Sequence, residues 1–538
     1  MSQSLLVLAP LLPLLLAPLM PLAVARRWHW ILALAALPAL LLALLAPVGS
    51  AVTLPWLLLG VHLELDAVGH LFLLFSSLIW LATGAYVAFG RAADAASGAF
   101  GVYFLLAMAG NLLLIVAADM LTFYTGFALM GLSAYGLVLR RSQRARRAGR
   151  VYLAFTLAGE LALFGAMLLL FGAGGSLLFS NLATGPLPDG AVALLLLGFG
   201  IKVALPGLHP WLPLTYTTAP VAAVAVLSGP MMKAGLLGWL RFLPPGAPGA
   251  DSWGPLLMVL GGLGILLGVA VGVLQRDPRA VLAYSSIAKM GLISVLFGAA
   301  LSNPQHADAL LAALLLFAMH HLLVKSTLFL GLGEWQRRGS RFWVLAGLAL
   351  LALSMVAVPF SGGAAAKQAI KVALEGELGL LLTLSAIGTV LLMARFLVLL
   401  PGRPARSLDP AVVPGLAWFT LVVVAFWAPF WPTEVPAEFA GLGSLAVGAG
   451  LVLAAWWIGR SHLASMPYIP PGDAFRLLAR LRLRLPELEW RGLPGPGLKS
   501  WLSMPDAVRR GEETALLGPG LYLFAVMSLL LGALWFPL

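Results

Sequence analysis

The sequence contains no cysteine and few charged side chains. Without cysteine the chain cannot form disulfides, thiolate metal sites or cysteine-ligated iron–sulfur clusters, so any redox chemistry belongs to a partner. Charged residues make up 10% of the 538 positions and hydrophobic residues make up 61%, whereas soluble domains carry about 25% charged residues. This composition excludes a soluble globular protein and indicates a protein that crosses a membrane many times.

Several motifs of soluble enzymes are also missing. The sequence has no GxxxxGK(S/T) phosphate-binding loop, no GxGxxG after a strand and no hydrolytic triad pattern. ATP-driven transport and dehydrogenase chemistry are therefore not expected in this chain. The histidines lack companion ligands at metal-binding spacing, so we expect no zinc or haem site and no cofactor in this chain.

Apolar runs of about 20 residues predict an all-α polytopic membrane protein with about 16 transmembrane helices. We place these helices at 4–24, 28–46, 68–90, 100–117, 120–140, 151–173, 191–213, 217–243, 254–275, 280–300, 308–331, 342–376, 377–400, 411–433, 440–459 and 515–536. The first run lacks a basic region before it and a cleavage site after it, so we interpret it as a retained helix.

The net charge of +12 comes from arginines that cluster between the predicted helices, which is how membrane proteins set their orientation. We expect no nucleic-acid partner. The clusters follow odd-numbered helices, so both termini are predicted on the non-cytoplasmic side of the cell (inner) membrane. The clustered residues are Arg26, Arg27, Arg140, Arg141, Arg144, Arg146, Arg147, Arg150, Arg276, Arg279, Arg337, Arg338, Arg341, Arg403 and Arg406.

Two predicted helices contain a break that is followed by a lysine. Pro230 precedes Lys233, and Pro359, Gly362 and Gly363 precede Lys367. Proline removes a backbone donor, so each helix should be kinked or unwound just before its lysine. The two broken helices fall in two matching sets of five helices, and an odd-length unit reverses its orientation in the membrane. The sequence therefore predicts two inverted five-helix repeats.

The expected organisation follows from these repeats. It comprises helices 1–3 at 1–99, the first repeat at 100–243, the second repeat at 254–400, two further helices at 411–459, a cytoplasmic amphipathic lateral segment at 460–514 and an anchoring helix at 515–538. The lateral segment contains AFRLLARLRLRLPELEW, which has a polar and an apolar side and suits the membrane interface. It equally suits a brace between helices or a solvated basic loop.

Lysines within the predicted membrane helices are the main candidates for ion translocation. Low dielectric surroundings disfavour the charged form of a lysine, so a buried lysine can release and regain a proton. Each one alone could be a snorkelling or salt-bridged side chain, but a set of this size indicates a proton pathway. The set is Lys202, Lys233, Lys289, Lys325 and Lys367, with Lys371 one turn beyond Lys367.

Histidines extend this set of lysines. His321 and Lys325 are four residues apart and share a helix face, His320 precedes His321, and His209 ends the seventh predicted helix. A histidine titrates near neutral pH and can pass protons between lysines. The alternative for each is a hydrogen-bonded core histidine.

Carboxylates are scarcer than lysines within the predicted helices. Glu160 is the one carboxylate well inside the first half, and we expect it to be the partner of Lys202. Its alternative is a protonated, hydrogen-bonded acid. Asp119 and Asp66 fall at helix ends, where Asp66 could be only a cap.

Five motifs of this sequence resemble those of one membrane-protein family. They are GFGIKVALPGLHPWLP, TAPVAAVAVLSGPMMKAG, DPRAVLAYSSIAKMG, HHLLVKSTLFLG and PFSGGAAAKQAI. In this order they are similar to the antiporter-like membrane subunits shared by respiratory complex I, Mrp-type cation/proton antiporters and group-four membrane-bound hydrogenases. The resemblance implies two inverted repeats, a Lys/His/Glu chain across the membrane midplane and proton movement driven by partner subunits.

The sequence departs from this family at three places. Ala128 stands where the family usually has the glutamate that pairs with the lysine equivalent to Lys202, so either Glu160 substitutes or the first half no longer pumps. Gln368 replaces an acid that commonly follows the second broken-helix lysine, and Lys289 adds a charge where a glutamine is common.

We expect a proton-translocating subunit of a multisubunit membrane complex. Lys202 and Lys233 would carry protons in the first half with Glu160 as a displaced modulator, His321 and Lys325 would form the central relay, and Lys367 would end the second half. The resemblance implies other membrane subunits as partners and leaves open a complex I-like or hydrogenase-like oxidoreductase, with iron–sulfur clusters, flavin or quinone in its partners, or a Mrp-type antiporter. Two alternatives are the membrane half of an inorganic-carbon-accumulating complex with a soluble zinc-dependent partner, and a scaffold that does not pump.

Overall fold

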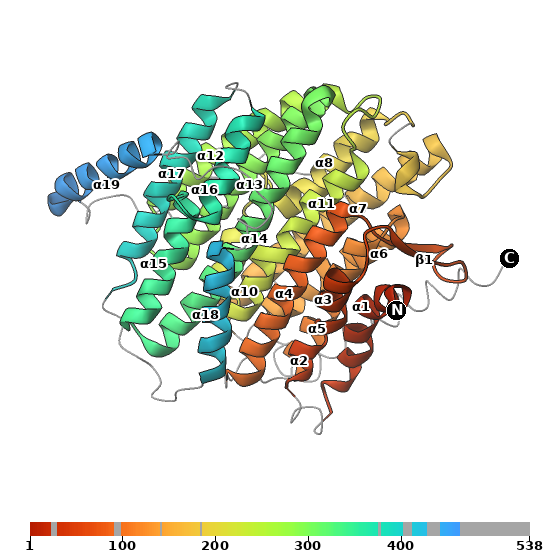
Figure 1. Ribbon diagram of the computed structural model, residues 1–538, viewed down its shortest axis with the longest axis horizontal. Coiled ribbons are helices and arrows are strands. Elements are labelled where there is room, and N and C mark those ends of the chain that lie inside the picture. The colour runs from red at the N-terminus through yellow and green to blue at the C-terminus, as the bar shows by residue number, and fades with distance from the viewer. Residues whose placement is uncertain are drawn as a thin grey trace, which may run out of the picture. The chain divides into compact units, whose positions relative to one another are not determined.

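Helices dominate the computed structural model, which describes residues 1–22, 29–90, 98–139, 142–182, 185–374, 378–401, 412–427 and 442–462 (Figure 1). The chain divides into a unit at Met1–Gly472 and a second unit at Asp473–Leu538. Apart from its first three residues, the predicted lateral segment at 460–514 lies outside the described residues, as does the anchoring helix at 515–538.

The helices follow one another along the chain with one short hairpin near the N-terminus. The elements are α1 (Ser2–Leu16), η1 (Ala17–Leu19), α2 (Ile31–Leu34), α3 (Leu37–Leu45), β1 (Ser50–Leu54), β2 (Val61–Leu65), α4 (Ala67–Phe89), α5 (Gly98–Val116), α6 (Met120–Val138), α7 (Gln143–Gly174), η3 (Phe179–Asn181), α8 (Asp189–Val203), α9 (Trp211–Thr218), α10 (Val221–Val226), η4 (Leu227–Met231), α11 (Met232–Phe242), η5 (Asp251–Trp253), α12 (Gly254–Val273), α13 (Pro278–Ser302), η6 (Pro304–His306), α14 (Ala307–Arg338), α15 (Phe342–Val356), α16 (Gly362–Ala373), α17 (Gly379–Val398), α18 (Val412–Trp427) and α19 (Leu442–His462).

Ten helices within the described residues are long and apolar enough to cross a membrane, and four shorter apolar helices accompany them. This confirms the predicted multi-pass helical membrane protein. The predicted number of about sixteen helices is not confirmed and stays a prediction, since it includes 515–536, which lies outside the described residues.

A two-stranded antiparallel hairpin, β1–β2, was not expected from the sequence. Val61, Leu63 and Leu65 are buried while Glu64 is exposed, which is the period-two alternation of a strand. The hairpin is too short to be found by a search for apolar runs of membrane length. The backbone N–H of His62 donates to the Asp119 carboxylate at 2.9 Å, which fastens the hairpin to the start of α6.

Two helices extend into segments that the sequence analysis assigned to basic loops. α7 begins eight residues earlier than predicted because the Ser142 hydroxyl caps it, accepting from the Ala145 N–H at 3.2 Å. α14 continues to Arg338, and the buried Glu334 pairs there with Arg337 at 3.3 Å and Arg338 at 2.6 Å. Arginines in these segments are therefore part of helices.

Glycines let α12 approach α13 closely. Gly254, Gly261 and Gly268 recur every seven residues on α12, and a Cβ at Gly261 would lie 2.5 Å from the carbonyl oxygen of Gly291. Small residues at such spacing allow two membrane helices to pack backbone against backbone. The apolar stretch of α13 that is long enough to span a membrane is completely buried, and α13 carries Lys289.

Candidate functional site

The first broken helix consists of α10, a π-helical turn at η4 and α11. Pro230 lies in this turn and has no N–H to donate, so the regular helical ladder is interrupted three residues before Lys233. Lys233 is completely buried, and its Nζ donates to the carbonyl oxygen of Ser228 at 3.0 Å. The predicted break is confirmed, and the lysine satisfies a carbonyl that the break leaves available.

A side chain from α14 supports the same break. The Ser326 hydroxyl donates to the carbonyl oxygen of Ala225 at 2.8 Å, one turn before Pro230. Gly229 lies against Ser326 so closely that a Cβ there would overlap the Ser326 hydroxyl. The unwound turn is thus held by α14, which also carries the predicted central relay.

The central relay residues all lie buried on α14. Lys325 donates to the carbonyl oxygen of Leu282 on α13 at 2.9 Å, and His320 lies 2.9 Å from the Ser354 hydroxyl. Neither ring nitrogen of His321 has a hydrogen-bond partner within the described residues. Lys325 lies one helical turn after His321 on α14, so the structure keeps these two basic side chains close together.

The second broken helix consists of α15 and α16. Ala357 and Phe360 have φ of 67° and 63°, a left-handed conformation that ends α15 and turns the chain, and Ser361 caps α16. This confirms the predicted break at Pro359, Gly362 and Gly363. Lys367 follows in α16, and its Nζ donates to the Ser444 hydroxyl of α19 at 2.7 Å.

A cavity of about 30 Å³ lies beside this second break. Lys289, His320, His321 and Lys367 line it from α13, α14 and α16. The Lys289 ammonium lies 5.4 Å from the ring centroid of Phe317, a contact that partly compensates a buried cation. The structure therefore brings four of the predicted site residues to one cavity.

In the first half, Lys202 contacts a tyrosine rather than a carboxylate. Its Nζ donates to the Tyr152 hydroxyl at 3.3 Å and lies 5.8 Å from the ring centroid of Phe127. The Tyr152 hydroxyl in turn donates to the carbonyl oxygen of Gly131 on α6 at 3.0 Å. The lysine is thus held by a hydroxyl and an aromatic ring, next to the turn of α6 that contains Ala128.

Glu160 lies in the same cavity as Lys202 without a direct ion pair between them. The cavity measures about 10 Å³, which is room for about one water molecule. Both carboxyl oxygens of Glu160 are buried and have no hydrogen-bond partner within the described residues. The expected neighbourhood of Glu160 and Lys202 is therefore present, whereas the direct contact of an ion pair is not.

The helix that carries Lys202 ends immediately after it, which was not predicted. α8 stops at Val203, and Ala204 has a φ of 63°. Pro206 disfavours helix at the residue before it, so the chain leaves the helix there. His209 lies buried in the connection to α9. Three of the predicted lysines, not two, therefore adjoin a helix break.

Lys371 differs from the other lysines because its side chain is exposed. It lines neither of the two cavities described above. We therefore leave it out of the buried set.

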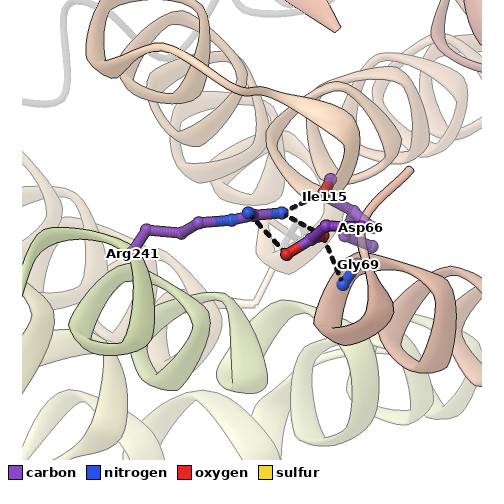
Figure 2. A network of polar contacts seen from close by, with 4 residues as sticks. All are labelled: Asp66, Gly69, Ile115 and Arg241. Carbon is purple, nitrogen blue, oxygen red and sulfur yellow. Dashed lines mark hydrogen bonds and ion pairs between the residues drawn. The ribbon is translucent and has the colours of Figure 1, made fainter. Parts of the chain in front are cut away.

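Asp66 does more than cap a helix. One carboxyl oxygen accepts from the Gly69 N–H at 2.8 Å, which caps α4 as expected. The same carboxylate forms two hydrogen bonds with the Arg241 guanidinium, at 2.8 and 2.9 Å, and Arg241 also donates to the Ile115 carbonyl oxygen at 3.3 Å (Figure 2). This clamp ties the end of α11 to the start of α4 and the end of α5, a role that the isolated Arg241 in the sequence did not indicate.

Tyr152 and Ser326 were missed by the sequence analysis. Tyr152 and Glu160 are eight residues apart, so they share a helix face, and this spacing could have found Tyr152. Ser326 adjoins Lys325 in sequence but gives no signal of its own. No group of histidine, aspartate and glutamate side chains that could hold a metal occurs among the residues described here.

Known proteins of similar sequence include an oxidoreductase subunit and a hydrogenase component. The family described as "NADH:quinone oxidoreductase/Mrp antiporter, TM" matches residues 117–391, just over half of the chain. The chain is 33% identical over 252 residues to hydrogenase-4 component B of Escherichia coli, covering 44% of this chain and 37% of that protein. It is 34% identical over 285 residues to NADH-quinone oxidoreductase subunit N of Desulforudis audaxviator, covering 49% of this chain and 56% of that protein.

A solved structure has the same fold. The Mrp complex from Dietzia sp. contains a chain that superposes with a TM-score of 0.71 at 20% identity, covering 98% of this chain and 63% of that one. At this identity the likeness concerns the fold alone. The two curated relatives are longer than their matched parts, since this chain spans between 37% and 56% of their lengths.

Proposed function

The chain belongs to the NADH:quinone oxidoreductase/Mrp antiporter family, and we propose that it translocates protons as a membrane subunit of a multisubunit complex. The observation that carries the proposal is the set of buried basic groups on α11, α13 and α14, which the half-buried Lys367 of α16 extends. Lysines in a membrane interior are costly and mark ion pathways. Here each of them is held by a carbonyl, a hydroxyl or an aromatic ring.

Protons would pass through the second broken helix by way of His321. His321, Lys289 and Lys367 line one cavity, and Lys325 lies one helical turn from His321 on α14. Ser326, next to Lys325, bonds the helix break that precedes Lys233. A histidine can accept a proton at one ring nitrogen and release another from the second. We therefore assign the order Lys233, Lys325, His321, Lys289 and Lys367, in which no lysine needs to leave its helix.

The first helix break and α19 supply the acceptors that Lys233 and Lys367 need between transfers. When Lys233 is protonated its ammonium donates to the Ser228 carbonyl, and Ser444 serves Lys367 in the same way. Loss of the proton weakens these contacts, since an ammonium forms stronger hydrogen bonds than a neutral amine. A change at either break, imposed by a partner subunit, would therefore change how firmly the lysine holds its proton.

In the first half we assign Glu160 as a modulator that acts across the cavity. One water molecule could join its carboxyl group to Lys202 or to the Tyr152 hydroxyl. Lys202 would then respond to the protonation of Glu160 without an ion pair. The packing of Gly235 against the Lys202 side chain brings α8 alongside α11, two residues from Lys233.

The remaining assignments follow from the family and the fold. We place the chain in the cell membrane with both termini on the non-cytoplasmic side, and we assign residues 100–243 and 254–400 to two inverted repeats. Its partners would be further membrane subunits, together with a soluble redox partner if the complex is an oxidoreductase. Copurification followed by mass spectrometry and an absorption spectrum separates that case from a Mrp-type antiporter.

The proposal is tested at His321. We expect His321→Leu to lower proton uptake by everted membrane vesicles several-fold, measured by quenching of a pH-sensitive dye, because the relay then lacks its central group. His306→Leu is the matched control, since His306 is exposed at the start of the same helix. Unchanged uptake in an assembled His321→Leu complex would contradict the proposal and favour a scaffold that does not pump.

A further inference from the structure

The cavity between α13, α14, α15, α16 and α17 has an unusual charge composition. Its titratable lining consists of Lys289, His320, His321 and Lys367, and hydroxyls of Ser385 and Thr389 complete its polar wall. No carboxylate of the described residues lines it. The cavity therefore offers hydrogen-bond donors and positive charge without a counter-charge from the described part of the chain.

A helix start adds to this positive character. α16 begins at Gly362, and Gly363 in its first turn lines the cavity. The first N–H groups of a helix have no partner within the helix, and its N-terminus carries a partial positive charge. A Cβ at Gly363 would overlap the carbonyl oxygen of Ser354, so glycine permits this close approach of α16 to α15.

One lining residue is a buried polar group without a partner. The His321 ring is completely buried, and neither of its nitrogens is hydrogen-bonded to any described residue. It stacks on Phe317 with a ring-centroid distance of 6.5 Å and an interplanar angle of 7°. A buried donor of this kind calls for a ligand, because leaving it unpaired is costly.

We propose that this cavity binds one small monovalent anion of the halide class, with chloride as the representative ion. Lys289 and Lys367 approach it from opposite helices, His321 supplies the unpartnered ring, and Gly363 supplies the helix N-terminus. A cavity of about 30 Å³ holds about two water molecules, which suits a monatomic ion better than a larger tetrahedral oxyanion. The apolar walls, which include Phe317 and Leu382, suit a weakly hydrated ion.

The bound anion would neutralise basic groups that otherwise repel one another when protonated. The groups that face the anion are Lys289, His320, His321 and Lys367, and no other titratable side chain among the described residues lines the cavity. Binding is an equilibrium property of the resting protein. Anion binding can therefore be tested independently of proton translocation.

The test is chloride binding to the purified complex in gluconate buffer, followed by the excess line width of the ³⁵Cl resonance. We expect saturable broadening that iodide displaces, and a loss of about tenfold or more in affinity in Lys289→Gln, since a charge-assisted contact is removed. Lys371→Gln is the matched control, because that lysine is exposed on α16 and lines neither cavity.

Lys367→Gln lies on a different helix and provides the same test if Lys289→Gln does not assemble. Absence of saturable broadening in the wild-type complex would overturn the proposal. Equal affinity in the wild type and in either assembled variant would overturn it as well. Neither result would bear on the effect of His321→Leu on proton uptake.

Discussion

At the scale of single residues, the hydrogen-bond partner of Lys202 differs most clearly from expectation, because it is a hydroxyl and not a carboxylate. Ala128 supplies no charge from α6, and the hydrogen bond of Lys202 goes to the Tyr152 hydroxyl at 3.3 Å. A hydroxyl cannot switch between charged and neutral forms at neutral pH as a carboxylate does. We therefore propose that Glu160, which lines the same cavity as Lys202, is the titratable group that modulates this lysine.

Removing the Tyr152 hydroxyl should impair the first half. Tyr152→Phe deletes the acceptor of Lys202 and the donor to Gly131, and we expect a loss of stability of about 1–3 kcal/mol because a buried polar group is left unpaired. Thermal unfolding in detergent measures this loss. Tyr216→Phe is the control, since its buried hydroxyl has no hydrogen-bond partner among the described residues. Equal losses in the two variants would contradict the assigned role of Tyr152.

Replacing Glu160 should separate stability from function. Glu160→Met removes a buried carboxyl group whose oxygens lack partners, so we expect the protein to gain about 1–3 kcal/mol in stability. We also expect proton uptake to fall several-fold, because Lys202 then lacks its modulator. Melting temperature and vesicle uptake are measured on the same preparation, with Glu64→Gln as the exposed control. Higher stability with unchanged uptake would show that Glu160 is not a modulator.

At the scale of helices, breaks and close glycine contacts position the candidate lysines. Lys233 and Lys367 both follow a break, and the two breaks differ in kind: one is a π-helical turn with a proline and the other is a left-handed connection. In both, a neighbouring helix satisfies the polar groups. The close packing of α12 on α13 holds Lys289 in place beside the second break.

This packing makes a specific prediction on α12. Gly261→Ala would place a Cβ 2.5 Å from the carbonyl oxygen of Gly291 and should destabilise the protein by about 1–3 kcal/mol, since the backbones must separate. Gly262→Ala on the next position meets Leu381 at 3.6 Å, an ordinary contact, and should be neutral or stabilising by up to about 1 kcal/mol. Thermal unfolding of the two variants decides, and a Gly261→Ala variant as stable as Gly262→Ala would refute this packing.

Much of the molecule could be predicted from its sequence at the largest scale. Apolar runs of membrane length and lysines after prolines or glycines gave the multi-pass fold and both predicted breaks, because these signals are local. The third break, after Lys202, was missed because the left-handed residue there is Ala204 rather than glycine. The hairpin was missed because its strands are short.

Contacts between distant parts of the chain could not be predicted in the same way. Arg241 pairs with Asp66, and Lys202 contacts Tyr152, although the two residues of each pair are far apart in sequence. No local sequence pattern predicts such pairs. The cavity lined by Lys289 and Lys367 likewise exists only where five helices meet. The predicted lateral segment at 460–514 still awaits a structural test, apart from its first three residues at the end of α19.

The central claim is that protons cross the membrane through the buried lysines of this chain. The most direct measurement is coupled proton flux in proteoliposomes that contain the purified complex, compared between wild type, Lys233→Ala and Lys367→Ala. We expect each substitution to reduce the flux several-fold while the complex stays assembled, because each removes one carrier from a series. Wild-type flux in both assembled variants would contradict the account.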